Sequence, residues 1–181
     1  QNEISPRIFY MRMTKVSPTT FDEFLKIIQG NGKNTTQNSL ILDLRGNIGG
    51  AIDLLPYFFG LFMGPNQYVY DFFQQGNYTP FRTKIGKLPE LEKYRKNVVL
   101  IDKASQSTAE DMTAVFKRFN LAVVVGVPSR GWGTIENTYP LKTVIDPAEK
   151  YSLFLVNSIT LRDDGQPIES RGVDPNINIT D

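Results

Sequence analysis

Residues 39–50 read SLILDLRGNIGG, an apolar run that ends in a glycine-rich turn. Short apolar runs of this kind are typical of parallel strands that are buried on both faces. Residues 97–102 (NVVLID) and 121–127 (LAVVVGV) repeat the pattern. Between these two runs, apolar residues recur at helical spacing at Met112, Val115, Phe116 and Phe119. A strand, a helix and a strand in this rhythm predict βαβ units and a mainly parallel sheet flanked by helices, an α/β fold.

The segments on either side extend this prediction. Alternation over residues 8–13 predicts a further strand, and the capping-box pattern Thr20-Phe-Asp-Glu23 predicts the start of a helix. Residues 64–96 are less regular, with prolines such as Pro80 marking loops. The tail over residues 151–161 is rich in β-forming residues. We expect residues 1–7 to be a flexible segment and residues 8–181 to form one domain.

The composition excludes several classes of function. A net charge of +1 argues against nucleic acid as the main partner. Without cysteine or histidine, the chain lacks thiolate metal ligands, the commonest zinc ligand and the commonest general base. We therefore expect no metal and no cofactor. No apolar run reaches the ~18 residues of a membrane span. Gln1 in place of an initiator Met favours a mature chain or a fragment.

Three loops follow the predicted parallel strands, and in open α/β sheets this edge is where ligands bind. In the first loop, the glycines of the turn that ends at Gly50 free backbone amides to hold an anion or a carbonyl oxygen; a plain strand-to-helix turn is the alternative. In the second loop, Ser107 stands at a helix start. It acts there either as the cap of Ser107-Thr-Ala-Glu110 or as a nucleophile whose oxyanion meets the amide of Thr108.

The third loop and a later motif add two candidate side chains. Trp132, in the loop Gly126-Val-Pro-Ser-Arg-Gly-Trp-Gly-Thr134, either lines a pocket or covers the core. Glu169, in Pro167-Ile-Glu-Ser-Arg-Gly172, is a candidate carboxylate. A solvated acid paired with Arg171 is the alternative reading of Glu169.

Taken in order, these four motifs resemble peptidase family S41, the C-terminal-processing or tail-specific serine peptidases. LDLRGNIGG is similar to the family's LDLRxNxGG, and SQSTAED is similar to the S-A-A-E-D of its tricorn-core-like branch. VGVPSRGWGT resembles its G-x-P-T-x-G-K-G loop, and GQPIESRGVDP resembles its closing G-x-x-I-E-G-x-G-V-x-P segment. The match covers residues 8–179 of the printed sequence.

The resemblance implies a ClpP/crotonase-like core and cleavage of peptide bonds through an acyl-enzyme. It makes Ser107 the nucleophile, places the oxyanion hole at Thr108 and the pair Gly49 and Gly50, and makes Glu169 an orienting or basic carboxylate. It also implies a peptide or unfolded-protein substrate bound as an added strand, and an extracytoplasmic location. A homo-oligomer is compatible with it. Many members carry a PDZ domain, for which no segment remains here.

The general base departs from the family pattern. Where the Ser–Lys members carry the basic lysine, this chain has Trp132, whose indole cannot accept a proton. The histidine of the tricorn-like branch lies upstream of the matched region. Three interpretations stay open: a fragment whose base lies elsewhere, another base (Glu169, Glu110 or Lys103), or an inactive peptide-binding domain. An acyl-CoA enzyme on the same core is a further alternative, supported by the glycine turn alone.

Overall fold

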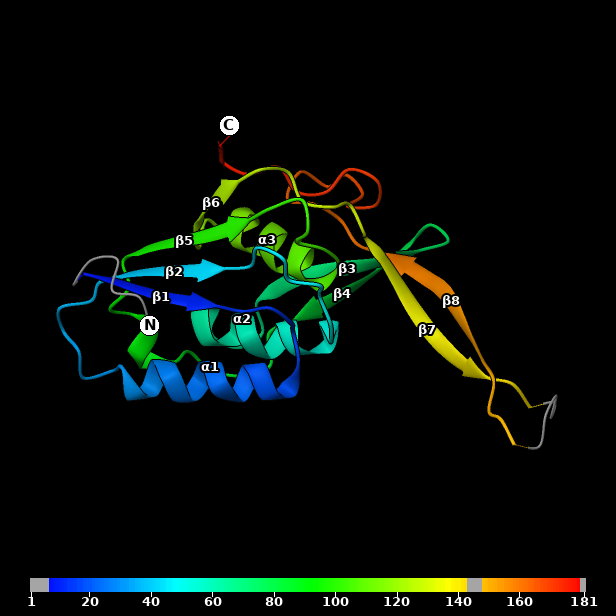
Figure 1. Cartoon of the computed structure of the whole chain (residues 1–181), viewed down its shortest axis with the longest axis horizontal. Helices are drawn as coiled ribbons and strands as arrows, with labels where there is room; N and C mark the ends of the chain where they lie inside the picture. Colours follow the sequence, from blue (N-terminus) through cyan, green and yellow to red (C-terminus); the bar gives the residue numbers. More distant parts are fainter. Residues whose placement is uncertain (1–6, 143–147, 180–181) are drawn as a thin grey trace.

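The computed structural model describes residues 7–142 and 148–179, which form two sheets and three α-helices (Figure 1). The first sheet contains, in spatial order, β1 (Ile8–Arg12), β2 (Ser39–Asp43), β5 (Lys96–Ile101), β6 (Val123–Gly126) and β9 (Ile177–Asn178). The second contains β4 (Asn77–Arg82), β3 (Tyr68–Gln74), β8 (Ser152–Ile159) and β7 (Thr134–Pro140). The helices are α1 (Pro18–Gly30), α2 (Leu55–Met63) and α3 (Thr108–Arg118), with 3-10 turns at Ile52–Leu54 and Pro89–Leu91.

All pairings in the first sheet are parallel, so the predicted α/β fold is confirmed. The three apolar runs of the sequence are its central strands β2, β5 and β6. Because these strands are parallel neighbours, their following loops meet at one edge of the sheet. The prediction of a flexible segment over residues 1–7 lies, except for Arg7, outside the described residues.

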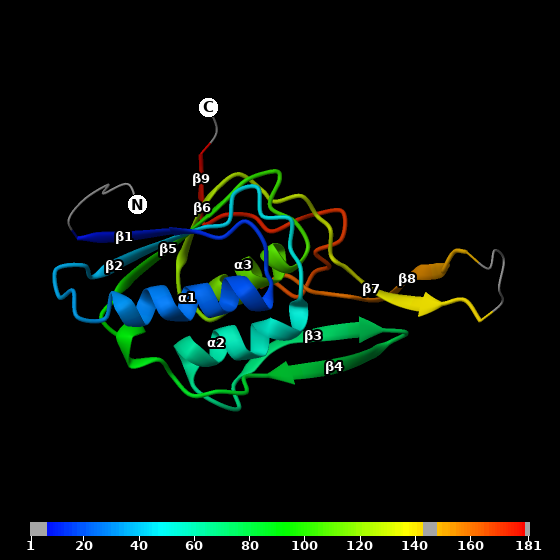
Figure 2. The ribbon, with the colours of Figure 1, turned by 60° about the horizontal axis from the view of Figure 1, so that its bottom comes forward.

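The helices cover one face of the parallel sheet, as Figure 2 shows. Burial alternates accordingly: Leu40 and Leu42 of β2 are buried on the helix side, whereas Ile41 between them is half-buried. In β6, Val123 is 42% exposed. The expectation of strands buried on both faces is therefore wrong for the described residues, because successive βα crossovers that all run in one direction place their helices on the same side.

Helix α1 begins three residues earlier than the sequence pattern suggests. Ser17 is the cap and Pro18 occupies the first turn, where the missing amide proton costs nothing. The hydroxyl oxygen of Thr20 then accepts a hydrogen bond from the backbone amide of Ser17 at 2.8 Å. The predicted capping box of Thr20 and Glu23 is thus wrong, and its place is taken by Ser17 and Thr20.

Helix α3 is held by an aromatic cluster beneath the parallel sheet. Phe116 of α3 meets Phe59 of α2 edge-on, with ring centroids 5.0 Å apart, and Phe58 and Phe62 complete the group. Such edge-to-face pairs add about 0.5–1.5 kcal/mol beyond their buried area. This packing fixes the helix at whose first turn Ser107 lies.

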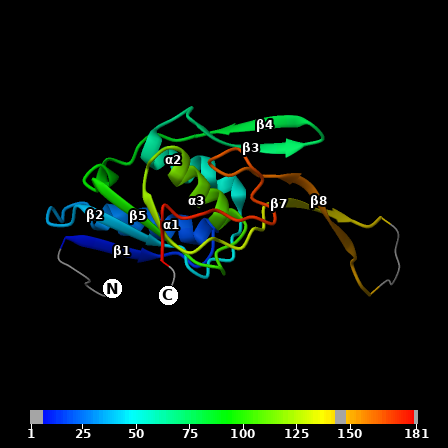
Figure 3. The same cartoon turned by 90° about the horizontal axis from the view of Figure 1, so that it is seen from above.

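The second sheet is antiparallel and includes the β-rich tail that the sequence predicts. Its strand β4 was not expected, because it contains Pro80. Proline is tolerated there because β4 is the edge strand of the sheet. At the other edge, β7 and β8 form a long hairpin that projects away from the helices and the parallel sheet (Figure 3).

Candidate active site

Ser107 lies between the loop that follows β5 and the first turn of α3. Its backbone has φ 55° and ψ −132°, a conformation that residues other than glycine rarely adopt. Strain of this kind costs on the order of 1–3 kcal/mol and is concentrated at functional sites. As the residue that caps α3, it places its hydroxyl at the positive end of the helix dipole.

The carboxylate of Glu110 binds both the backbone amide of this serine and the loop that follows β6. Oε2 accepts from the amides of Ser107 at 2.9 Å and Trp132 at 2.8 Å. Oε1 accepts from the hydroxyl of Ser129 at 2.6 Å and the amide of Gly131 at 2.7 Å. The side chain is completely buried. The capping box predicted for Ser107 and Glu110 is thus present, and Glu110 also binds the loop after β6.

The glycine-rich turn packs directly against Ser107. A Cβ on Gly49 would lie 2.6 Å from the Cβ of Ser107 and 2.9 Å from the amide nitrogen of Thr108, so only glycine fits. The hydroxyl of Thr108 donates to the carbonyl of Gly50 at 2.9 Å and joins the turn to α3. The site residues Gly49, Gly50, Ser107 and Thr108 are therefore brought together.

Two of these amides are available to a ligand. The amide of Gly49 donates to Oδ1 of Asn47 at 2.8 Å and is already occupied. The amides of Gly50 and Thr108 have no acceptor within residues 7–142 and 148–179. Of the amides suggested by the sequence, these two can hold an oxyanion formed beside Ser107.

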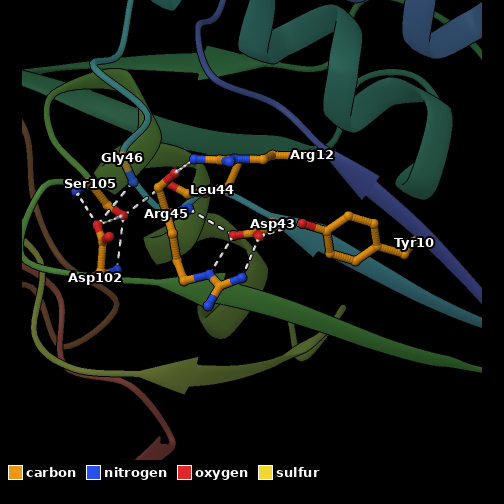
Figure 4. Close-up of polar contacts among 8 residues, drawn as sticks. All are labelled: Tyr10, Arg12, Asp43, Leu44, Arg45, Gly46, Asp102 and Ser105. Carbon is orange, nitrogen blue, oxygen red and sulfur yellow. Dashed lines mark hydrogen bonds and ion pairs between the residues drawn. The ribbon is translucent and has the colours of Figure 1, made fainter. Parts of the chain in front are cut away.

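Asp102, at the end of β5, ties the serine loop to the glycine turn (Figure 4). Its Oδ1 accepts from the amide of Gly46 at 3.0 Å and from the amides of Ala104 and Ser105 at 2.9 Å each. The amide of Gln106 then donates to the carbonyl of Asn47 at 3.0 Å. The two loops are thus fixed to each other directly before Ser107.

Asp43 anchors the beginning of the glycine turn (Figure 4). Arg45 binds both of its oxygens, with Nε at 2.9 Å and Nη2 at 2.7 Å, and the Tyr10 hydroxyl donates at 2.6 Å. Burial of Asp43 disfavours its charge, but the hydrogen bonds from Arg45 and Tyr10 outweigh that cost and hold its pKa below the ordinary value. This carboxylate is structural and charged at neutral pH.

The third loop carries Trp132 and binds Glu169 through the amide of Gly133, and neither side chain contacts the hydroxyl of Ser107 in the described residues. The indole of Trp132 is 43% exposed, lies 5.6 Å from the guanidinium of Arg130, and donates to Glu136 at 3.1 Å. It therefore does not cover the core. Glu169 accepts from the amide of Gly133 at 2.9 Å and makes no ion pair with Arg171 among the described residues.

None of the three alternative bases contacts the hydroxyl of Ser107 in the described part of the chain. Both oxygens of Glu110 already accept hydrogen bonds, and Glu169 is directed at Gly133. Lys103 is exposed in the loop after β5. The arrangement can hold a nucleophile and an oxyanion, and it leaves the proton acceptor unassigned.

Comparison with known proteins identifies the family of this chain. The model of "Peptidase family S41" matches residues 7–179. The chain belongs to peptidase family S41. A carboxy-terminal-processing protease of Bartonella bacilliformis is 25% identical over 174 residues, which are 94% of this chain and 38% of that protein.

Solved structures show the same fold. The photosystem II D1 C-terminal processing protease has a TM-score of 0.76 at 16% identity, over 95% of this chain and 42% of that one. A lipoprotein from Streptococcus agalactiae has a TM-score of 0.73 at 18% identity, over 99% and 64%. The chain spans less than two thirds of each of these relatives.

Two further findings bear on partners. No helix in the described residues is long and apolar enough to cross a membrane. Nor do those residues contain a group of three or more acidic side chains placed to hold a metal ion.

The sequence did not reveal how the S41 site is supported. The sequence predicts Glu110 as a cap and a candidate base, but its hydrogen bond with Gly131 joins residues that are 21 positions apart. Asp102 and Asn47 were not singled out. A carboxylate directly after a buried strand, facing a second glycine loop, is the signal that points to Asp102.

Proposed function

We propose that this domain is a serine peptidase domain that cleaves peptide bonds through an acyl-enzyme on Ser107. The observation that carries the proposal is a serine hydroxyl, on a strained backbone at a helix start, beside the amides of Gly50 and Thr108, which have no acceptor in the described residues. Membership of a peptidase family supports the reaction class. The expected substrates are peptides or unfolded proteins.

In this mechanism Oγ of Ser107 attacks the carbonyl carbon of the substrate while its proton passes to a base. The oxyanion accepts hydrogen bonds from Gly50 and Thr108, and each such donor contributes about 10²–10³ in kcat. The C–N bond then breaks, the departing amine takes the proton, and water hydrolyses the ester. Glu110 fixes the position of the nucleophile relative to the loop after β6 through its hydrogen bonds to both.

Glu169 is the carboxylate best placed to orient an incoming base. Only its Oε2 accepts a hydrogen bond, from Gly133, which leaves Oε1 without a partner in the described residues. Glu110, in contrast, has both oxygens committed to four donors. We therefore propose Glu169 as an orienting residue and Glu110 as a structural one.

Labelling with a fluorophosphonate probe tests the proposal. We expect covalent modification of the folded chain at Ser107, located by peptide mass spectrometry. The Ser107→Ala variant and the heat-denatured chain should not be labelled. An unlabelled folded chain, together with peptide cleavage that is the same in wild type and Ser107→Ala, would overturn the proposal.

A second candidate function is peptide binding without cleavage. The observation that favours it is Trp132, which stands where the Ser–Lys members carry their lysine and which is bound to Glu136. This function predicts peptide affinity that survives Ser107→Ala, with no turnover in either protein. Calorimetric titration beside a cleavage assay separates the two functions.

We also propose an extracytoplasmic location, supported by the fold shared with a streptococcal lipoprotein. Fractionation of cells that express the full-length protein tests it, and recovery in the cytoplasmic fraction alone would contradict it.

A further inference from the structure

The connection from β6 to β7 includes a rigid loop, residues 129–133 (SRGWG), here called the tryptophan loop (Figure 1). Each of its five backbone amides donates a hydrogen bond, at 2.7–3.2 Å, to an oxygen atom outside the loop. These acceptors are the carbonyls of Val173 and Ser105, both carboxylate oxygens of Glu110, and Oε2 of Glu169. Any hydrogen-bond donor that the loop offers to a ligand therefore belongs to a side chain.

Among the side-chain donors of the tryptophan loop, those of Arg130 are free. The hydroxyl of Ser129 and the indole N–H of Trp132 each donate to a glutamate, at 2.6 Å and 3.1 Å. The exposed guanidinium of Arg130 makes no hydrogen bond and no ion pair among the residues that the structure describes. Arg118 provides the contrast, because its guanidinium, also over an aromatic ring, donates to four oxygen atoms.

Trp132 holds the guanidinium of Arg130 in place without using its N–H groups. The guanidinium carbon lies 5.6 Å from the centroid of the indole ring. The indole is itself fixed, because its N–H donates to Glu136 and the backbone amide of the same residue donates to Glu110. A guanidinium that contacts an aromatic ring in this way keeps its N–H donors, whose fork matches the two oxygens of a carboxylate. Arg130 is therefore held ready to bind a carboxylate.

The tryptophan loop is fixed to the loop that carries Ser107. The backbone amides of Trp132 and Ser107 donate to the same oxygen of Glu110, at 2.8 Å and 2.9 Å. The amide of Arg130 donates to the carbonyl of Ser105, two residues before Ser107, at 3.0 Å. A peptide whose carbonyl carbon lies at Ser107 therefore has Arg130 and Trp132 close to one side of the bond that is cleaved.

We propose that Arg130, held against Trp132, determines specificity by binding an aspartate or glutamate side chain of the substrate beside the bond cleaved at Ser107. The proposal rests on the peptidase function for the position of the peptide. Within an unfolded protein, the carboxylates that can lie next to an internal bond are those of side chains, so the free guanidinium selects an acidic residue. Glu136 and Glu169 do not occupy Arg130 in the described part of the chain, because each is held by hydrogen bonds of its own.

The fluorescence of Trp132, the chain's single tryptophan, reports on this site directly. Ser107→Ala removes the nucleophile, so binding is measured without turnover. The probes are the acetylated and amidated heptapeptide Ala-Val-Ala-Glu-Ala-Val-Ala and its counterpart with Gln in place of Glu, which lacks any carboxylate. We expect the Glu peptide to bind about fivefold more tightly, the effect of an exposed ion pair with favourable geometry.

Two matched arginine variants of the Ser107→Ala protein assign the preference to a residue. Arg130→Gln should bind both peptides equally. Arg171→Gln removes the same charge from an exposed residue of the segment that packs against Gly131, and it should keep the preference. Equal binding of the two peptides before substitution, a preference that survives Arg130→Gln, or an equal loss in both variants would overturn the proposal. Trp132 fluorescence that stays unchanged with both peptides would do the same.

Cleavage by the wild-type protein provides a second test, in which Glu is moved along the peptide one position at a time. We expect mass spectrometry to show the cleaved bond at a constant number of residues from Glu. Arg130→Gln should raise KM for these peptides about fivefold and change kcat by less than about twofold, because the ion pair contributes equally in the ground state and the transition state. A cleaved bond that keeps its place when Glu moves would contradict the assignment.

The two proposals fail in different ways. Fluorophosphonate labelling of Ser107 together with equal binding of the Glu and Gln peptides would overturn the role of Arg130 and leave the peptidase function standing. A preference for the Glu peptide that is lost in Arg130→Gln, in a chain that is neither labelled nor able to cleave, would refute the peptidase function and support carboxylate binding by Arg130.

Discussion

At the scale of single residues, the candidate S41 site is built by steric necessity. Gly49 has φ +84° and no room for a side chain, and Ser107 adopts φ 55° although it has one. Glycine allows the close approach of the two loops, whereas Ser107 adopts a strained backbone conformation of the kind that is concentrated at functional sites. The two residues are in contact, so a change in either one moves the other.

Gly49→Ala isolates this contact. The added methyl group would overlap Ser107 and the Thr108 amide, so we expect fluorophosphonate labelling to fall at least tenfold. Gly76→Ala is the control, because Gly76 has φ +83° and nothing within 4 Å of the added Cβ. Both variants carry the left-handed penalty of about 1–2 kcal/mol. Equal labelling rates in the two variants would refute the close-packing role.

Glu110→Gln tests the carboxylate that joins two loops. An amide in place of one oxygen would turn its own N–H groups towards donors that now bind Glu110. Because buried donors left unpaired cost about 1–3 kcal/mol each, we expect a loss of about 3 kcal/mol in urea unfolding. The exposed Glu149→Gln should change stability by less than about 0.5 kcal/mol.

At the scale of elements, α3 carries a second buried acid, Asp111, which makes stability depend on pH. Burial raises the pKa of Asp111 to about 7, the charge of Glu110 adds to this, and Thr160 and Arg118 oppose it. The folded state therefore binds this proton more tightly than the unfolded state does. Its contribution to stability is present at low pH and is lost as pH rises from about 4 to about 7.

Asp111→Asn should remove that dependence. The free energy of unfolding of the wild type should include a decrease of at most about 1.4 kcal/mol per pH unit from this group, and the variant should lack it. Urea unfolding at pH 4.5, 6 and 8 measures the difference, with the exposed Asp22→Asn as the control. Parallel pH profiles for wild type and Asp111→Asn would contradict the assignment.

The elements also show which features the sequence could predict. β2, β5 and β6 were predictable because an apolar run is a local signal, and Ser107 and the glycine turn follow directly from strand ends. β4 was not predictable, because a proline such as Pro80 indicates a loop in sequence. It is compatible with a strand only at the edge of a sheet, and the sequence does not show that β4 is an edge strand. The contact between Glu110 and the loop at Gly131 depends on how α3 and β6 pack, which no local pattern encodes.

At the scale of the whole molecule, the side chain of Arg118 joins α3 to the second sheet. Arg118, at the end of α3, donates to the carbonyl of Val69 in β3 at 3.1 Å. It also donates to the carbonyls of Leu161 at 3.3 Å and Arg162 at 2.6 Å, beyond β8. Ser107 caps the start of the same helix, so Ser107 and the second sheet are both attached to α3.

Arg118→Ala should therefore weaken the molecule at this junction. It leaves three backbone carbonyls without their charged donor, and hydrogen bonds to charged groups contribute about 1.5–3 kcal/mol each, so we expect a loss of about 3 kcal/mol in urea unfolding. Arg118→Lys should recover part of it, because an ammonium reaches fewer of the carbonyls than the guanidinium fork does. The exposed Arg95→Ala is the matched control. If Arg118→Ala matched that control in stability, these hydrogen bonds would contribute nothing to the attachment of α3 to the second sheet.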